Sequence, residues 1–410
     1  MLHKFYKHKL KNNLEVIAVP MNKGSNVITS NIYYKVGSRN ETMGKSGIAH
    51  MLEHMNFKST KNLKEGEFDK IVKSLGGVDN ASTGFDYTHY FIKTSSPYLE
   101  KTFELFSEVM ENLNLNDDEF QRERKVVYEE RLWRTDNNPI GYLYFRLFNN
   151  TFLYHPYHWT PIGFKEDILN WSIKDIRSFH KTYYQPKNAF LLVAGDIDPD
   201  VVFTQAEKHF SHIKNSKKIP QVHMKEPPLD GDRHIIIERE TQVDIVALAF
   251  RIPDFRHEDQ FALSAYSEIL SGGKSGTLRE KLINKKALVS EVYAYNMELK
   301  DPGVFLALAV CNPGVSPKKV LKELKNELIN TKITKKALKK VKNQTKMDFL
   351  TQLESSSGVS NIYGDYFAKG DISPLLEYED KINSLTPEKV ESIKKYFDKC
   401  VSVELIKKES

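Results

Sequence analysis

Residues 47–60 read GIAHMLEHMNFKST and place two histidines and a glutamate inside one short apolar stretch. The apolar positions repeat at the spacing of one face of an α-helix: Ile48, Met51, Leu52 and Met55. His50, Glu53 and His54 fall on the opposite side of that helix. The stretch therefore predicts a helix over residues 44–57, with Ser46 as its N-cap, that carries chemically active side chains away from its apolar face.

The spacing of these side chains is that of a metal site. The two histidines stand at i and i+4, which lets both imidazoles reach one ion, and Glu53 lies between them. His-x-x-Glu-His is the inverted zinc-protease, or inverzincin, arrangement. The alternative is an ordinary solvent-exposed helix face. Because catalytic zinc usually takes three protein ligands, the site requires a third one from elsewhere.

The segment DDEFQRERKVVYEERLWR, residues 117–134, is predicted as a helix that supplies this ligand. Four of its residues lie within about 80° of one another at 100° per residue: Phe120, Glu123, Val127 and Glu130. Glu129 should face water instead. The alternative is that Glu123 and Glu130 form salt bridges with Arg124, Lys125 or Arg134. We favour Glu130 as the third ligand and Glu123 as a supporting carboxylate.

The bulk composition excludes several functions. With 410 residues, the chain should form at least two domains. The net charge of +6 is too diluted to suggest a nucleic-acid partner. No secretory signal is recognisable, and no apolar run approaches the ~20 residues that span a bilayer, so no membrane partner is expected. Cys311 and Cys400 make no disulfide framework, which favours a cytoplasmic location.

The predicted elements occur in the same order twice. The first series contains strands at 14–20 and 26–36, helices at 44–57 and 66–77, a strand pair at 78–95, helices at 97–113 and 117–134, and a strand at 190–197. The second contains strands at 233–240 and 244–253, a helix at 258–273, a strand pair at 298–313, and helices at 316–329 and 335–354. We predict an α+β fold with domains at 1–215 and 233–410, joined by a polar linker at 216–232.

In this combination the chain resembles the M16 family of zinc peptidases, the pitrilysin/insulinase group that includes the mitochondrial processing peptidases. In that family a glutamate follows the His-x-x-Glu-His motif by about 76 positions, and here Glu130 follows His54 by 76 residues. The resemblance extends over nearly the whole chain. Further matching segments are residues 36–60, 76–91, 123–130, 155–163 and 183–198.

The resemblance implies two similar α+β domains, each a mostly antiparallel sheet covered by helices, that enclose a peptide chamber (the LuxS/MPP-like metallohydrolase fold). It implies a metalloendopeptidase with one Zn²⁺ per chain, held by His50, His54 and Glu130. Glu53 would be the general base toward a zinc-activated water, and Glu123 would support the site. The helix expected at 258–273 carries no histidine, so the second half should hold no metal.

The resemblance also implies how extended or unfolded peptides bind. Asn80 and Ala81 would offer hydrogen bonds to the substrate as an added β-strand. The alternative for Asn80, without the resemblance, is a turn residue.

The chain departs from the family at one expected pair. Active members place an Arg and a Tyr seven residues apart in the second half, and Ile283 and Ser290 stand at those positions here. Arg279, Tyr293 and Tyr295 are close in sequence but do not have the spacing. We therefore expect a partner: a related chain that supplies the Arg/Tyr pair in a heterodimer, or a second copy in a homodimer. The alternative function is a non-catalytic assembly subunit.

Overall fold

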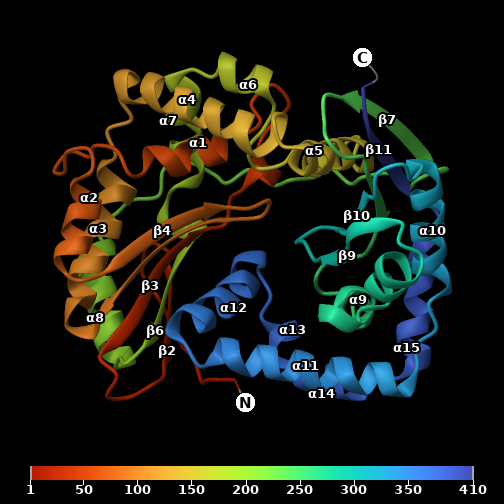
Figure 1. Ribbon diagram of the computed structural model, residues 1–410. Coiled ribbons are helices and arrows are strands. Elements are labelled where there is room, and N and C mark those ends of the chain that lie inside the picture. The colour runs from red at the N-terminus through yellow and green to blue at the C-terminus, as the bar shows by residue number, and fades with distance from the viewer. Residues whose placement is uncertain (1, 409–410) are drawn as a thin grey trace. The chain divides into compact units, whose positions relative to one another are not determined.

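The computed structural model describes residues 2–408, which form two units, each built on one β-sheet (Figure 1). Unit 1 comprises the stretch up to Arg131, Trp159–His223 and Phe349–Ile372. Unit 2 comprises Leu132–His158, Met224–Asp348 and the stretch from Ser373.

The sheet of unit 1 has six strands in the order β1-β2-β6-β3-β5-β4. Their bounds are β1 Tyr6–Lys9, β2 Glu15–Pro20, β3 Val27–Tyr34, β4 Val78–Thr83, β5 Thr88–Ser95 and β6 Ala189–Gly195. β2 and β6 run parallel, and the other neighbours are antiparallel. β4 therefore forms one edge of the sheet.

The sheet of unit 2 has five strands in the order β7-β11-β8-β10-β9. Their bounds are β7 Arg233–Arg239, β8 Ile245–Arg251, β9 Val289–Met297, β10 Val304–Cys311 and β11 Val401–Lys407. β7 and β11 run parallel, and the others are antiparallel. Without β1, this is the connectivity of unit 1, so the predicted repeat and the predicted α+β fold are confirmed.

Helices from the same half of the chain cover one face of each sheet. In unit 1, α1 (Ile48–Met55), α3 (Leu99–Asn112) and α8 (Pro199–Phe210) cover the sheet face opposite to the one that carries Tyr33 and Phe190. In unit 2, α9 (Asp259–Ser271) and α10 (Pro317–Asn330) bury a corresponding set from β8 and β10. Unit 1 also contains α2 (Glu67–Ser74), α4 (Asp117–Arg131), α6 (Lys165–Asn170) and α7 (Ile173–Tyr183).

The opposite face of each sheet is covered by a helix from the other half of the sequence. α12 (Ser356–Lys369) packs on β3 and β6, and α5 (Pro139–Thr151) packs on β8 and β11. The predicted boundaries assigned 132–158 to the first domain and 349–372 to the second, whereas the structure places each segment in the other unit. The physical reason is that both faces of these sheets are apolar, and each half supplies local helices for only one face.

Two predicted elements need correction. The strand pair expected at 298–313 is one strand, β10, whose partner β9 comes earlier in the chain. The helix expected at 117–134 is α-helical only to Arg131, and a π-helical turn follows at Leu132–Asp136. Long helices at 335–354 and 97–113 are present as α11 (Lys335–Leu353) and α3.

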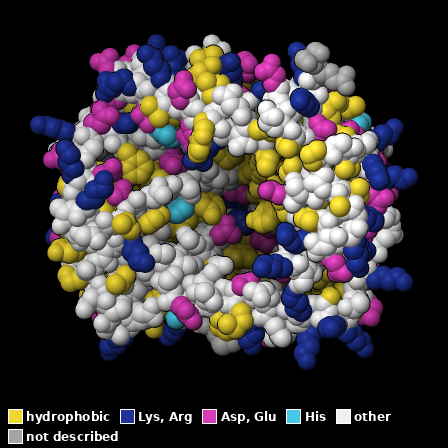
Figure 2. All heavy atoms as spheres, viewed as in Figure 1, with side chains coloured by type: hydrophobic (Ala, Val, Ile, Leu, Met, Phe, Trp, Pro, Cys, Tyr) yellow, Lys and Arg dark blue, Asp and Glu magenta, His cyan; other side chains and the backbone are white. Residues whose placement is uncertain are grey.

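The surface is charged but mixed. On the face shown in Figure 2, basic and acidic side chains are interspersed. Cys311 and Cys400 are buried and not bonded to each other. Within residues 2–408, none of the helices combines the length and apolarity required to cross a bilayer.

Candidate metal site

α1 carries the two histidines on its less buried side. Its core side is fully packed and consists of Ile48, Ala49, Met51, Leu52 and Met55. The His50 and His54 side chains are 13% and 21% exposed, so both are reachable from one side while their backbone is fixed by the core. The helical periodicity seen in the sequence thus sorts core from candidate ligands as predicted.

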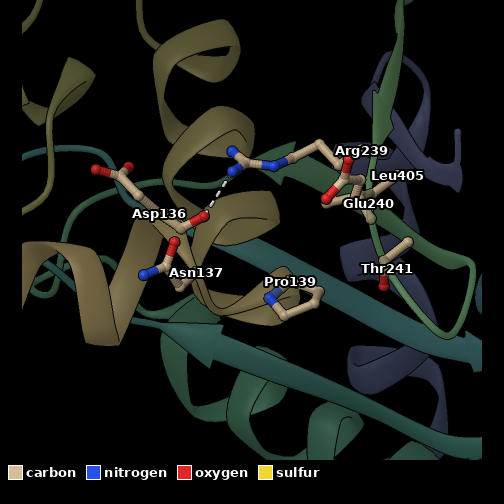
Figure 3. A pocket seen from close by; sticks show the side chains of 7 residues that line it. All are labelled: Asp136, Asn137, Pro139, Arg239, Glu240, Thr241 and Leu405. Carbon is tan, nitrogen blue, oxygen red and sulfur yellow. Dashed lines mark hydrogen bonds between the residues drawn. The ribbon is translucent and has the colours of Figure 1, made fainter.

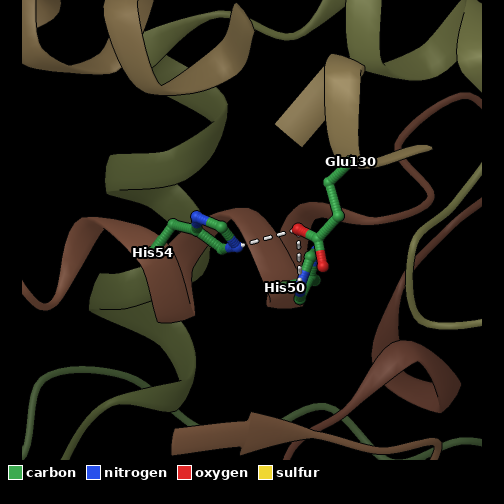
Figure 4. A group of neighbouring side chains, drawn as sticks. All are labelled: His50, His54 and Glu130. Carbon is green, nitrogen blue, oxygen red and sulfur yellow. Dashed lines mark ion pairs between the residues drawn. The ribbon is translucent and has the colours of Figure 1, made fainter. Parts of the chain in front are cut away.

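The two histidines meet Glu130 of α4 (Figure 4). His54 Nε2 lies 3.3 Å and His50 Nε2 lies 3.7 Å from Glu130 Oε2, and all three ligand atoms lie within 4.8 Å of one another. Tetrahedral zinc with bonds of ~2.1 Å separates its ligand atoms by about 3.4 Å. The nitrogen and oxygen donors therefore have both the chemistry and the spacing to hold one zinc ion.

Glu123, two turns before Glu130 on α4, orients His54. His54 Nδ1 donates to Glu123 Oε1 at 2.8 Å, which leaves Nε2 directed at Glu130. Burial lowers the pKa of His54, but the hydrogen bonds to Glu123 and Glu130 outweigh burial and raise this pKa to about 9. The surroundings of the imidazole thus favour positive charge, which a divalent cation can supply in place of the proton.

Lys58 holds the other oxygen of Glu123. Its Nζ lies 2.7 Å from Glu123 Oε2 and 3.1 Å from Glu65 Oε1. Burial raises the pKa of Glu123, but the hydrogen bonds from His54 and Lys58 outweigh burial and keep this pKa below 4.5. Glu123 is therefore ionised at neutral pH. Its observed partners, His54 and Lys58, differ from the alternative salt-bridge partners considered from the sequence. Glu129 is exposed, as predicted.

A buried carboxylate, Glu41, anchors the start of α1. The N-cap is Gly47, which has φ 83° and no capping side chain, so the predicted Ser46 cap is wrong. Glu41 instead accepts from the backbone N–H groups of Gly47 and Ala49, each at 2.8 Å, and from the Trp159 indole at 2.7 Å. Ser46 faces Asp167, to which its backbone N–H and its hydroxyl both donate.

Glu53 lies beside the edge strand β4. Its Oε2 accepts a hydrogen bond from the hydroxyl of Thr83, the last residue of β4, at 2.5 Å. Asn80 and Ala81 are part of β4 itself, not of a turn, and Asn80 Oδ1 accepts from Ala81 N at 2.9 Å. The predicted general base and the predicted substrate strand thus lie next to each other in unit 1.

The two positions at which the resemblance predicts an Arg/Tyr pair lie in unit 2. Ile283 belongs to the π-helical segment Arg279–Lys285 and is half-buried, and Ser290 is exposed on β9. Tyr293 and Tyr295 project from the same strand and are 37% and 55% exposed.

Unit 2 also contains a polar pocket of about 300 Å³ (Figure 3). Arg239 is one of its lining residues: Nη2 donates to the carbonyl of Asp136 at 2.6 Å, and the guanidinium lies 4.0 Å from the centre of the Tyr142 ring. These contacts fix the start of α5. The remaining lining residues are Asn137, Pro139, Glu240, Thr241 and Leu405. None of the residues predicted for the site lines this pocket.

Three residues of the site were not predicted from the sequence: Glu41, Lys58 and Thr83. Lys58 follows His54 by four residues, so helical spacing could have indicated it. Glu41 and Thr83 reach α1 from a loop and a strand end, and no local periodicity connects them to it.

Comparisons with known proteins bear on this site. Residues 16–152 match the family described as Insulinase (Peptidase family M16), and residues 170–345 match the Peptidase M16 inactive domain. The zinc protease PqqE of Helicobacter pylori is 54% identical over 376 residues, 90% of this chain and 85% of that protein. The mitochondrial-processing peptidase subunit beta of Bos taurus is 25% identical over 415 residues, 96% and 82% of the two chains.

Among solved structures, the crystal structure of a protease from Helicobacter pylori matches with a TM-score of 0.96 and 50% identity. The match covers 99% of this chain and 100% of that one. All the residues of the candidate metal site, from Glu41 to Glu130, fall within the first matched range, 16–152.

Proposed function

This chain belongs to peptidase family M16, and from that premise we propose that it is a zinc-dependent endopeptidase acting on extended or unfolded peptides. The observation that carries the proposal is the convergence of His50, His54 and Glu130 within 4.8 Å, with Glu53 on the same helix as the histidines. A closely similar protein bears the name zinc protease, which supports the choice of metal.

His50 Nε2, His54 Nε2 and Glu130 Oε2 would hold one zinc ion per chain. When bound, zinc lowers the pKa of water and polarises a substrate carbonyl. The Glu53 carboxylate takes a proton from the attacking water and returns it to the leaving amine, the work of a general acid–base residue. Glu123 keeps the His54 Nδ1 protonated and its ring oriented, which places Nε2 for the ligand role.

We propose that β4 binds the substrate backbone. β4 is an edge strand, so one side of its backbone is not paired within the sheet. An extended peptide can add to that edge, with hydrogen bonds to the backbone near Asn80 and Ala81. The Asn80–Ala81 hydrogen bond lies on this path and would have to be shared or displaced. Most segments of a folded protein have their backbone groups paired internally, so this mode of binding favours extended or unfolded peptides.

We propose further that a second chain completes the catalytic machinery. Ile283 and Ser290 stand at the positions where the family resemblance predicts an Arg and a Tyr, and they offer neither a guanidinium nor a phenol. Oxyanion donors are each worth about 10²–10³-fold in rate, so an apolar side chain at this position implies help from elsewhere. A similar protein is named as a subunit, the beta subunit of a processing peptidase, which favours a related partner chain over a second copy.

The metal assignment is tested by elemental analysis of the purified chain and three variants. We expect about one zinc per chain, loss of zinc in His54→Ala, and retention of zinc in Glu53→Gln. Glu129→Gln, from the exposed side of the same helix as Glu130, is the matched control and should retain zinc. A wild-type chain without zinc affinity would overturn the proposal.

Activity is tested on an unstructured peptide with a quenched fluorophore, with the chain alone and together with the protein that co-purifies with it. We expect cleavage only with the partner, and a loss of about 10²–10⁴-fold in Glu53→Gln. Full activity of the isolated chain would exclude the required partner. A complex that binds zinc yet cleaves no peptide, with or without Glu53, would favour the assembly-subunit alternative.

A further inference from the structure

The hydroxyl of Thr83 connects the substrate strand to the general base. Thr83 is the last residue of β4, and its Oγ1 donates to Glu53 Oε2 at 2.5 Å. Hydrogen bonds to a carboxylate are about twice as strong as those between neutral groups and fix the direction of the acceptor. One oxygen of Glu53 is therefore tied to a residue of β4, although Glu53 itself belongs to α1.

Thr83 is held by the β-hairpin that it closes. It pairs with Thr88 across the β4–β5 turn, and the Thr88 hydroxyl lies 3.0 Å from the carbonyl of Val36 and 3.4 Å from the Thr83 hydroxyl. Thr88 is fully buried. The Thr83 side chain thus contacts a buried hydroxyl that is itself hydrogen-bonded to the carbonyl of Val36, just after the end of β3.

The tip of the same hairpin is clamped by backbone groups that precede α1. Ser38 N donates to Gly84 O at 3.2 Å, and Arg39 N donates to Phe85 O at 2.9 Å. The clamp requires a glycine at position 37, because a Cβ there would come within 2.5 Å of Gly84 O. Backbone hydrogen bonds therefore hold the hairpin that carries Thr83 in place relative to the segment before α1.

The alternation of β4 makes Thr83 distinct from its neighbour. Successive side chains of a strand point to opposite faces, so Ser82 projects away from the face on which Thr83 meets Glu53. The Ser82 hydroxyl pairs with His89 Nδ1 at 2.9 Å. The two adjacent hydroxyls therefore have different partners.

We infer that Thr83 is a positioning residue that fixes the Glu53 carboxylate relative to a peptide bound along β4. The inference rests on the proposed function, because it assigns Thr83 a role only if Glu53 is the base and β4 holds the substrate. Because the hydrogen bond from Thr83 ties the Glu53 carboxylate to β4, a small movement of β4 with its bound peptide would carry the carboxylate along. The distance from Glu53 to the scissile bond would then change little. Such positioning acts on the chemical step more than on substrate affinity.

The test compares Thr83→Val, which keeps the shape but removes the hydroxyl, with Thr83→Ser, which keeps the hydroxyl. Both are measured in the complex of the chain with its co-purifying partner, on the quenched peptide. For Thr83→Val we expect kcat to fall about 10- to 100-fold with KM within about twofold of wild type, below the 10²–10⁴-fold cost of losing the base. Thr83→Ser should recover most of kcat. Ser82→Ala removes a hydroxyl that pairs with His89 and not with Glu53, so it should lower kcat much less than Thr83→Val does.

Zinc content and thermal unfolding of each variant accompany the kinetics. If Thr83→Val fails to fold, Thr83→Ala provides the same loss of the hydroxyl with less bulk beside Glu53. Equal kcat in wild type, Thr83→Val and Thr83→Ala would overturn the inference, as would a loss in Thr83→Ser as large as that in Thr83→Val. A wild-type complex with no zinc-dependent cleavage would instead overturn the proposed function, so the two failures are distinguishable.

Discussion

Glu123 and Glu130 show how one helix gives two carboxylates different tasks. Both project from the same side of α4, but Glu130 meets the Nε2 atoms of the two histidines, whereas Glu123 meets the opposite nitrogen of His54 and Lys58. The ammonium group of Lys58 pairs with the Glu123 carboxylate and balances its charge. Glu123 is therefore a poor metal ligand but a good acceptor for orienting His54. The division of roles follows from the neighbours of each carboxylate, because the two side chains are chemically identical.

This division predicts the effect of Glu123→Gln. A glutamine oxygen can still accept from His54 Nδ1, but without charge it orients and polarises the ring less, so we expect zinc affinity to fall about 10- to 100-fold. The stoichiometry at saturating zinc should remain one per chain. Competition with a chelating dye measures the affinity, and Glu129→Gln is the control on the same helix. An affinity equal to that of wild type would show that Glu123 has no orienting role.

At the residue scale, the sequence predicted which side chains meet and not what holds them. His50 and His54 share a helix face, and Glu130 shares a face with Glu123, so periodicity indicated the candidate ligands of each helix, and the family resemblance brought them together in the cluster that the structure contains. Glu41 lies in a loop and Thr83 at the end of a strand, and both form hydrogen bonds to residues at or next to α1. Neither residue belongs to the helix, so helical spacing does not connect them to it. Their hydrogen bonds depend on loop paths, which residue spacing does not determine.

Among the elements, α1 and its counterpart α9 begin in different ways. α1 is anchored by the distant carboxylate Glu41, whereas α9 begins with its own buried carboxylate, Asp259. Asp259 lies 2.8 Å from Lys389 Nζ and 2.7 Å from Lys395 Nζ, and it accepts from the Tyr396 hydroxyl at 2.7 Å. These partners tie the start of α9 to α15 (Pro387–Ser392) and to the 3₁₀ turn that follows α15.

This cluster predicts a pH-dependent stability. Burial raises the pKa of Asp259, but the hydrogen bonds from Lys389, Lys395 and Tyr396 outweigh it and hold the pKa well below 3.8. A lowered pKa in the folded state stabilises the protein above the unfolded-state value of 3.8, and this contribution is lost as the pH falls below it. We expect Asp259→Asn to destabilise unit 2 by about 1.5–3 kcal/mol at pH 7.

Urea unfolding of wild type and Asp259→Asn at pH 7, 5 and 3 measures this difference. It should be nearly equal at pH 7 and 5 and smaller at pH 3. Glu258→Gln is the matched control, since Glu258 shares the partner Lys389 but is exposed, and it should leave stability nearly unchanged at each pH. A difference that is constant over the range would show that the Asp259 charge does not contribute.

Elements with strong periodicity were predictable, and those without it were not. β3, β8 and the helices α1, α3, α4 and α11 fall where alternating or helical patterns placed them. The partner of β10 was misplaced because the alternation of β9 is weak: Tyr293 and Tyr295 lie on its exposed face, whereas Asn296 is buried. The cap of α1 was assigned to Ser46, but the backbone N–H groups at the start of α1 donate to the carboxylate of Glu41, six residues before Gly47.

At the scale of the whole molecule, the exchange of helices explains why the domain boundaries were predicted incorrectly. α5 and α12 occupy equivalent places in the two repeats, each as the helix that follows two long ones, and each packs on the sheet of the other repeat. Sequence patterns show that a helix has an apolar face but not which sheet that face covers. A contiguous division was therefore the simplest expectation and also the wrong one in these two segments.

The exchange predicts that the first half of the chain does not fold alone. α12 covers Tyr33, which is 1% exposed and donates its hydroxyl to Ser360 O at 3.0 Å, and α12 approaches so closely that a Cβ at Gly364 would overlap the Tyr33 ring. A fragment of residues 1–232 lacks this helix and would leave the aromatic face of Tyr33 and Phe190 in water. We expect the fragment to bind a hydrophobic dye, to aggregate and to unfold without cooperativity.

Joining residues 349–372 to the fragment through a flexible linker should restore cooperative thermal unfolding, because the missing cover is then present in the same chain. The matched control carries Gly364→Leu in the added segment, which prevents close approach to Tyr33 and should not restore folding. A 1–232 fragment that unfolds cooperatively without the addition would show that α12 is dispensable. If instead the added helix rescues the fragment, the first half of this chain requires α12 from the second half to complete its core, and a stable first unit cannot be obtained by cutting at the linker.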